Sequence, residues 1–217
     1  MIYINGTSGF IAGNFLKIIP NHSITPVGRR LKNHKLNEFD IFIQMASPSD
    51  KYDFEKTEET IISMLDDVYH NIDLVKKAKA TFIFASSEAI YEDNNRYGAF
   101  KIAIMRYLKH TGVKYINLII PRVYGVDRPK GLMKQIKDGI PEKDLNKIIK
   151  FIDIKEFCEI LKKEIYPRPE KLYQDITFNT SYTMTIKQIK EFYKLWTTLI
   201  IFFNAIISLT IDIYNNK

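Results

Sequence analysis

The segment SSEAIYEDNNRYGAFK, residues 86–101, holds the side chains of this sequence best suited to proton transfer. Tyr97 and Lys101 are four positions apart, so on a helix they share one face and the ammonium can stand near the phenol. Because a nearby cation favours the phenolate, Tyr97 could exchange a proton with a substrate hydroxyl, and Ser87 could orient the same oxygen. The spacing alone also fits an exposed tyrosine–lysine pair on an ordinary amphipathic helix.

Composition restricts the class of protein. With 217 residues, 46% of them hydrophobic and 26% charged, the chain is typical of one soluble globular domain. The net charge of +7 favours an anionic ligand such as a nucleotide, and the absence of a basic–aromatic motif argues against nucleic acid. Four scattered histidines predict no metal site. A single cysteine, Cys158, and an N-terminus without a signal-peptide pattern suggest a cytoplasmic protein.

Short β-rich runs alternate with helical patterns along the first 120 residues. The runs MIYIN, SITPV, FDIFIQMA, TFIFAS and YINLII are separated by helical patterns that include residues 10–19, 55–79 and 97–110. This alternation predicts an α/β fold with a Rossmann-like, doubly wound parallel sheet. We expect residues 1–125 to form the nucleotide-binding part and residues 126–194 a small substrate lobe over the carboxyl edge of the sheet. In that lobe, residues 176–194 are expected to form a strand, a turn and a helix.

Glycines separate the first strand from the first helix. Gly6, Gly9 and Gly13 allow a sharp turn and a close approach of the backbone to a pyrophosphate, which helix N–H groups can then bind. The second strand ends PVGRR, with no acidic residue to bind a ribose 2′-hydroxyl. Arg29 and Arg30 could instead pair with a 2′-phosphate, which favours NADP over NAD. The alternative is that both arginines lie on a solvated loop.

Four segments resemble a known family. NGTSGFIAGNFL is similar to the opening of the extended short-chain dehydrogenase/reductases, with Ala12 where that family has its third glycine. TFIFASSEAIY resembles the strand that carries the family's catalytic serine, and YGAFK matches its Y-x-x-x-K pair. LIIPRVYG is similar to a later family segment near the substrate. The resemblance extends from residue 1 to about residue 194 and is strongest in the first 125.

This resemblance implies an NAD(P)-dependent enzyme that reduces the 4-keto group of a nucleotide-activated sugar or epimerises such a sugar. The implied catalytic residues are Ser87, Tyr97 and Lys101. Cofactor-binding positions would be Gly6, Ser8, Gly9, Phe10, Ile11, Arg29, Arg30, Ala46, Lys101 and Pro121. Substrate-binding positions would be Ser87, Glu88 and Arg122, although Arg122 fits a salt-bridged loop arginine equally well. Relatives often form homodimers through the helices that correspond to residues 55–79 and 97–110.

The sequence departs from the family pattern in several places. Only nine residues separate Ser87 from Tyr97, and Ala89 stands where a dehydratase has its glutamate base, which disfavours a dehydratase. Asp67 replaces a usual asparagine, and we do not expect it to be catalytic. The uncharged run from Leu195 to Ile211 suits a buried or partner-covered helix better than a membrane span, with an altered tail as another alternative. These departures keep a second hypothesis open: a catalytically reduced nucleotide-binding protein with a role in sensing or protein association.

Overall fold

The computed structural model describes residues 1–32, 34–46, 58–125 and 145–191, and positions 128, 135, 136, 138, 139, 194, 195 and 198. The chain divides into two compact units. The first contains Met1–Tyr124 and Phe151–Ser181, and the second contains Gly125–Lys150 and Tyr182–Lys217. The chain passes from one unit to the other after Tyr124, Lys150 and Ser181.

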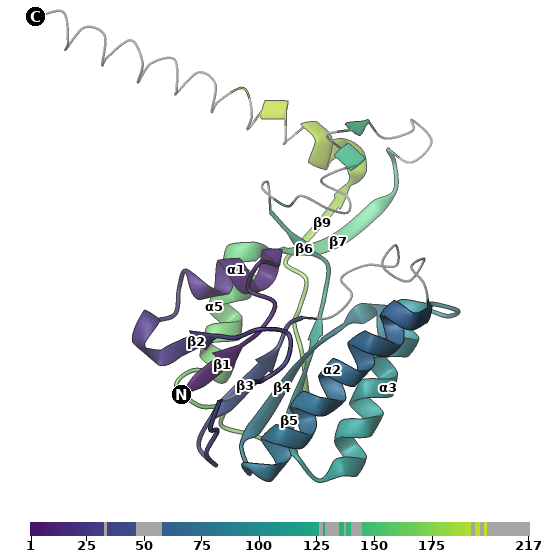
Figure 1. Cartoon of the computed structure of the whole chain (residues 1–217). Helices are drawn as coiled ribbons and strands as arrows, with labels where there is room; N and C mark the ends of the chain where they lie inside the picture. The colour runs from purple at the N-terminus through teal and green to yellow at the C-terminus, as the bar shows by residue number, and fades with distance from the viewer. Residues whose placement is uncertain are drawn as a thin grey trace, which may run out of the picture. The chain divides into compact units, whose positions relative to one another are not determined.

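A parallel sheet of six strands forms the centre of the first unit (Figure 1). Its strands in spatial order are β2 (Ile24–Pro26), β1 (Ile2–Ile4), β3 (Ile41–Gln44), β4 (Thr81–Ser87), β5 (Lys114–Ile120) and β8 (Gln174–Thr177). All five pairings between neighbours are parallel. The doubly wound α/β fold predicted from the sequence is thus confirmed, with β8 added at one edge.

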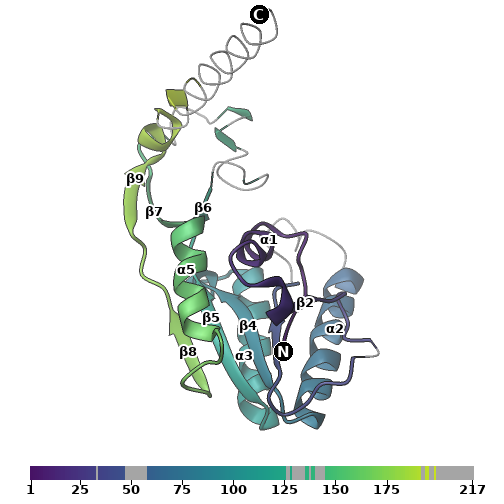
Figure 2. The same cartoon turned by 90° about the vertical axis from the view of Figure 1, so that its left-hand side faces the viewer.

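Helices cover both faces of this sheet (Figure 1, Figure 2). One face carries α1 (Phe10–Leu16) and α5 (Ile154–Ile165), and the other carries α2 (Glu58–Lys77) and α3 (Arg96–Thr111). Side chains alternate along a strand, so Ile43 and Ile83 pack toward α1 and α5, whereas Phe42 and Phe82 pack toward α2 and α3. A sheet buried on both faces needs continuously apolar strands, which explains the apolar runs in the sequence.

The winding direction reverses at β1. The chain passes from β1 outward to β2 and then returns to β3 on the other side of β1. Loops after β1 and β3 consequently leave the sheet in opposite directions, and in such sheets this switch point at the carboxyl ends is where ligands bind. Gly6 follows β1 and Ala46 follows β3, so these two of the predicted cofactor positions lie at the switch point.

The helix ends mostly agree with the sequence patterns. Asn95 caps α3 by accepting hydrogen bonds from the N–H groups of Tyr97 (3.0 Å) and Gly98 (3.3 Å). Gly112 ends the same helix in the left-handed conformation, with φ of 74°. The first helix is shorter than predicted, because the helical pattern of residues 10–19 continues past Leu16 only as a turn.

The remaining elements follow β5. Within the first unit, β6 (Val123–Tyr124) pairs with the end of β7 (Ile148–Asp153), and Asp153 caps α5 through the N–H of Lys155 (2.8 Å). Short 3-10 helices occur at η1 (Asn21–Ser23) and η3 (Glu88–Tyr91). Residues 176–191 contain two strands, the end of β8 and then β9 (Tyr182–Thr185), where one was predicted; a helix over residues 186–191 follows.

Part of the predicted lobe and tail lies outside the described residues. This applies to most of residues 126–144 and of 195–217, and also to residues 55–57 of the predicted second helix. In the second unit, the described residues pair the backbone after β9 with the segment before β7, since Ile186 N–H donates to Lys147 O (3.0 Å). Within the described part of the chain, no helix combines the length and apolar character needed to cross a membrane.

Candidate functional site

The glycine turn closes tightly against the end of β3. Gly6 has φ of 70°, and a Cβ atom there would lie 2.6 Å from the backbone nitrogen of Ala46. The Gly9 N–H donates to the Gly6 carbonyl at 2.8 Å and closes the turn. Glycine at position 6 is therefore required twice, by the left-handed backbone and by the contact between two backbones at the switch point.

The turn then leads into α1, and the predicted cofactor-binding residues along this stretch differ in exposure. Ser8 and Gly9 are exposed, whereas Phe10 and Ile11 are partly buried and pack against the core. Ala12 stands where the similar family has a third glycine, and it is buried, with 2% of its surface exposed. The predicted ligand-facing part of the turn is thus Ser8 and Gly9, and the helix that follows supports it by packing.

Three buried amides connect the loops at this edge of the sheet. Gln44 Oε1 accepts hydrogen bonds from Asn5 Nδ2 (3.0 Å) and from Asn71 Nδ2 (2.9 Å), and all three side chains have no exposed surface. Asn5 Oδ1 also accepts from the N–H groups of Met45 (2.8 Å) and Ala46 (2.7 Å). Buried amides satisfied in this way fix a unique geometry, here that of the turn after β3.

Sequence reasoning missed this amide cluster of Asn5, Gln44 and Asn71. A signal exists in the sequence, because Asn5 and Gln44 are polar residues at the ends of otherwise apolar strands. A polar residue at such a position is normally assigned to the start of a loop. The partnership with Asn71, which comes from the distant α2, depends on the tertiary fold.

Arg29 and Arg30 follow β2 and both pair with Asp67 on α2. Arg29 Nη1 lies 3.4 Å from Asp67 Oδ2, and Arg30 Nε donates to Oδ1 of the same carboxylate. The hydrogen bond and charge of Asp67 raise the pKa of Arg30. The Asp67 side chain is 9% exposed, against 57% for Arg29 and 41% for Arg30. Both arginines are therefore held on one side by a buried carboxylate and open to solvent on the other.

The predicted catalytic residues lie on β4 and on α3, two elements that pack against each other. Ser87 is the last residue of β4, and its Oγ accepts a hydrogen bond from Ala89 N–H at 3.3 Å. Tyr97 is in the first turn of α3 and is half-buried. Lys101 is one turn further along, with its Nζ 5.4 Å from the centroid of the Tyr97 ring. The spacing of these residues thus produces the expected pairing of tyrosine and lysine on one helix face.

The environment of Lys101 is unusual for an amine. Only 1% of its surface is exposed, and its Nζ donates to the Ala85 carbonyl at 2.7 Å. Burial lowers the pKa of this amine to about 7. The charge of Lys101 therefore changes near neutral pH.

Gly98, inside the Y-x-x-x-K motif, explains how the short interval between Ser87 and Tyr97 is spanned. The chain forms η3 directly after β4, and this 3-10 helix packs against the start of α3. A Cβ atom at position 98 would lie 2.2 Å from the carbonyl oxygen of Ala89. Glycine thus permits a contact between backbones that keeps the nine-residue connection compact.

The substrate-side predictions lie at the same edge. Ser87 is in register with Ile120 at the end of β5, so Pro121 and Arg122 follow beside it. Pro121 is buried, whereas Arg122 and Glu88 are exposed. The Arg122 carbonyl accepts a hydrogen bond from Ile152 N–H at 3.0 Å, so its backbone is anchored while its side chain is exposed.

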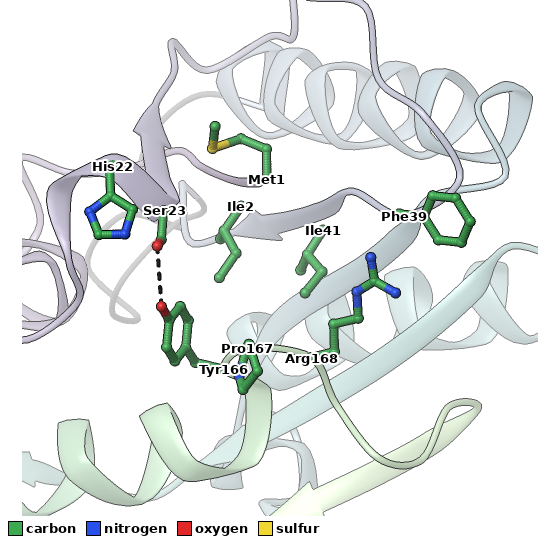
Figure 3. Close-up of a pocket in the computed structure, with 9 residues that line it drawn as sticks. All are labelled: Met1, Ile2, His22, Ser23, Phe39, Ile41, Tyr166, Pro167 and Arg168. Atoms are coloured by element: carbon green, nitrogen blue, oxygen red, sulfur yellow. Dashed lines mark hydrogen bonds between the residues drawn. The ribbon is translucent and has the colours of Figure 1, made fainter.

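A cavity of about 270 Å³ lies at the amino edge of the sheet, where the strands begin (Figure 3). Its lining includes Ile2 and Ile41, at the amino ends of β1 and β3, and the loop Tyr166–Arg168 after α5. Tyr166 and Ser23 share a hydrogen bond of 3.2 Å across its wall. None of the predicted site residues lines this cavity, so it is separate from the candidate site.

The described residues include side chains of the kinds that bind metals and one cysteine, Cys158. They contain no group of three histidine, cysteine or acidic side chains arranged to hold a metal ion. Cys158 is buried, and burial raises the pKa of its thiol to about 12, so the reactive thiolate is scarce at neutral pH.

Comparisons with known proteins give a match in structure. No protein-family model and no curated protein sequence matches the chain. Pal from Bacillus thuringiensis superposes with a TM-score of 0.69 and 13% identity, over 88% of this chain and 81% of that chain.

Two further solved structures contain nucleotides. The dTDP-4-dehydrorhamnose reductase of Bacillus anthracis in complex with NADP has a TM-score of 0.67 and 12% identity, over 91% of this chain and 81% of the reductase. The enzyme WbmG of Bordetella bronchiseptica in complex with NAD and UDP has a TM-score of 0.66 and 14% identity, over 90% and 77%. The chain therefore shares the fold of these proteins, and at the level of the fold the resemblance seen in the sequence is confirmed.

Proposed function

We propose that this chain is an NAD(P)-dependent enzyme of the extended short-chain dehydrogenase/reductase type that reduces or epimerises a nucleotide-activated sugar. The observation that carries the proposal is the arrangement at the carboxyl edge of the sheet. Ser87, Tyr97 and Lys101 come from the end of β4 and the start of α3, and they share that edge with the Gly6 turn and the arginines after β2. The NADP and the UDP in two structures of the same fold support a nucleotide for both cofactor and substrate.

The residues at this edge suit a nicotinamide dinucleotide. The turn from Gly6 to Gly9 offers backbone N–H groups with an exposed serine, and Arg29 and Arg30 offer exposed guanidinium groups for a phosphate. Pro121 and Ala46 would border the same ligand. A nicotinamide nucleotide, when bound, supplies hydride transfer, which no amino-acid side chain provides.

The protein's own contribution is the movement of a proton. In reduction, the Tyr97 hydroxyl donates a proton to the carbonyl oxygen of the sugar and becomes a phenolate; in oxidation, the Tyr97 phenolate accepts the proton of the sugar hydroxyl. Ser87 accepts a hydrogen bond from Ala89, and its own O–H is still able to donate to that oxygen. Lys101 lies one helical turn away, and its protonated form favours the Tyr97 phenolate.

Substitution of Tyr97 tests the proposal. The purified protein is mixed with NADPH or NADH and a UDP- or dTDP-linked 4-keto sugar, and cofactor oxidation and sugar product are measured. Tyr97→Phe should lower turnover by about 10²- to 10⁴-fold while nucleotide affinity is unchanged, because a positioned acid typically contributes that much. The matched control is Tyr91→Phe in η3, whose side chain is 70% exposed and should not matter. If the Tyr97→Phe variant turns over substrate as fast as the wild type, the proposed role of Tyr97 is refuted.

The same assay separates the two reactions. A reductase consumes NADPH in step with the sugar, whereas an epimerase recycles its cofactor and should carry bound nucleotide through purification. A protein that binds NADPH but turns over no 4-keto sugar or sugar nucleotide would instead support the second candidate, a nucleotide-binding protein without catalysis. The observation favouring that candidate is the burial of Lys101, whose amine is directed to the Ala85 carbonyl.

A further inference from the structure

One face of α2 holds the loop after β2 in two ways. Asp67 accepts hydrogen bonds from the side chains of Arg29 and Arg30. Four residues later, Asn71 binds the backbone of the same loop: its Oδ1 accepts from Leu31 N–H (2.8 Å) and its Nδ2 donates to the Arg29 carbonyl (2.8 Å). Residues four apart share a helix face, so the helix fixes both the path of the loop and the direction of its two guanidinium groups.

This arrangement leaves part of each guanidinium available. A guanidinium has five N–H donors, and the single Asp67 carboxylate binds Nη1 of Arg29 and Nε of Arg30. The arginines are half-exposed, whereas the carboxylate is buried beneath them. Asn5, which directly precedes the glycine turn, donates to the Arg29 carbonyl at 3.2 Å. The backbone of the arginine loop therefore lies beside the residue that precedes the predicted phosphate-binding turn.

We propose that Asp67 is a positioning residue that sets the cofactor choice of this enzyme, by holding Arg29 and Arg30 as a preformed clamp for the 2′-phosphate of NADP. The inference rests on the proposed function. An arginine side chain loses rotamer freedom when it binds a ligand, so a buried carboxylate that orders two of them beforehand removes that cost from binding. The three residues together carry one net positive charge, which still attracts the phosphate.

In the opposite role, Asp67 would neutralise the arginines and compete with the phosphate for them. The direction of the change in 2′,5′-ADP affinity on removal of the Asp67 charge distinguishes these two roles. We would measure the affinities of 2′,5′-ADP and of 5′-AMP, which differ in the 2′-phosphate, by calorimetry. Asp67→Asn keeps the size of the side chain and removes its charge. The matched control is Asp66→Asn, the same charge change at the neighbouring, exposed position of α2, whose charge also reaches Arg30.

A positioning role predicts that Asp67→Asn weakens 2′,5′-ADP binding by about 5- to 10-fold and leaves 5′-AMP binding unchanged, in line with the loss of a charge-assisted hydrogen bond. Asp66→Asn should leave 2′,5′-ADP binding unchanged or make it slightly tighter. If Asp67→Asn instead tightens 2′,5′-ADP binding, or weakens both ligands equally, the proposal is overturned.

A second variant keeps Asp67 in place in case its substitution prevents folding. Arg30→Lys retains the charge and removes the planar fork that Asp67 orients, so it should weaken 2′,5′-ADP binding while 5′-AMP binding is unchanged. Unchanged 2′,5′-ADP binding would overturn the clamp. Failure of the proposed function looks different, because the wild-type protein would then bind neither 5′-AMP nor 2′,5′-ADP.

Discussion

The carboxyl edge of the central sheet, where its strands end, and the amino edge, where they begin, are lined by different kinds of side chains. At the carboxyl edge, the amide cluster, Asp67 and Lys101 are all buried polar groups with hydrogen-bond partners. At the amino edge, the cavity has an open wall in which Phe39 is 59% exposed and the Arg168 guanidinium lies 4.9 Å from the centre of its ring. The cavity therefore lies at the amino edge, together with buried Asp40 and Thr81, whereas the larger group of buried polar side chains lies at the carboxyl edge.

The cavity and the candidate site residues therefore lie at different edges of the sheet, and the candidate site residues lie with the larger group of buried polar side chains. Burying an amide or a charge costs free energy unless it is fully paired, so a fold retains such groups where they fix a geometry. At the amino edge, the buried Asp40 plays this part for the N-terminus, since its carboxylate binds the Met1 ammonium (2.9 Å) and the Asn37 N–H (2.8 Å). The loops that form sites in parallel sheets leave from the carboxyl edge.

The largest expected effect comes from two glycines on α3, one near each edge. Gly98→Ala at the carboxyl edge should destabilise the fold by about 3 kcal/mol, since its Cβ would overlap the Ala89 carbonyl and force η3 to move. Gly112→Ala at the amino edge has open space and a left-handed backbone, and should cost about 1 kcal/mol. Urea unfolding measures both, and equal costs would contradict a tight contact at the carboxyl edge.

Next in size is the removal of one member of the amide cluster. Asn71→Leu should cost about 2 kcal/mol, because it leaves the buried Leu31 N–H without its acceptor. The matched control is Asn117→Leu in β5, where among the described residues Oδ1 has no partner and Nδ2 binds Asp175. That change should stay within about 1 kcal/mol. If thermal unfolding ranks the two variants in the opposite order, the amide cluster does not stabilise the carboxyl edge.

The buried Lys101 predicts a dependence of stability on pH. Its pKa is lowered from 10.5 to about 7 in the folded state, so between these values the unfolded chain binds more protons and stability rises with pH. One proton gives a slope of at most about 1.4 kcal/mol per pH unit, and below the folded pKa this slope disappears. Lys101→Met should flatten the slope, whereas Lys109→Met, an exposed position on the same helix, should not. Identical slopes in the wild type and Lys101→Met would contradict the burial of the amine.

The smallest effect is expected at the amino edge. Tyr166→Phe removes the hydrogen bond with Ser23 at the cavity wall and should cost at most about 1 kcal/mol of stability. Nucleotide affinity should not change, because the cavity lies at the amino ends of β1 and β3, whereas the glycine turn follows the carboxyl end of β1. A clear loss of nucleotide affinity in this variant would show that the amino edge contributes to nucleotide binding.

Much of this molecule could be predicted from local patterns. Apolar runs and helical periods identified the parallel sheet, and the spacing of Tyr97 and Lys101 put both on one face of α3. The Gly6 turn followed from the position of three glycines between the first strand and the first helix, since glycine is the residue that adopts a left-handed turn readily. These features are predictable because they depend on residues near one another in the chain.

Contacts between distant segments decided the rest. The sequence showed Arg29, Arg30 and Asp67 as separate residues, and the crossover from β3 through α2 made Asp67 the partner of both arginines. The sequence indicated that Lys101 is a cation near Tyr97, and its burial between α3 and β4 lowers its pKa to about 7. Spacing along the chain determines which side chains share an element, but burial and partners depend on how the elements pack. For this protein, the sequence determined the fold and the identity of the candidate proton-transfer residues, and the tertiary structure decided their electrostatic surroundings.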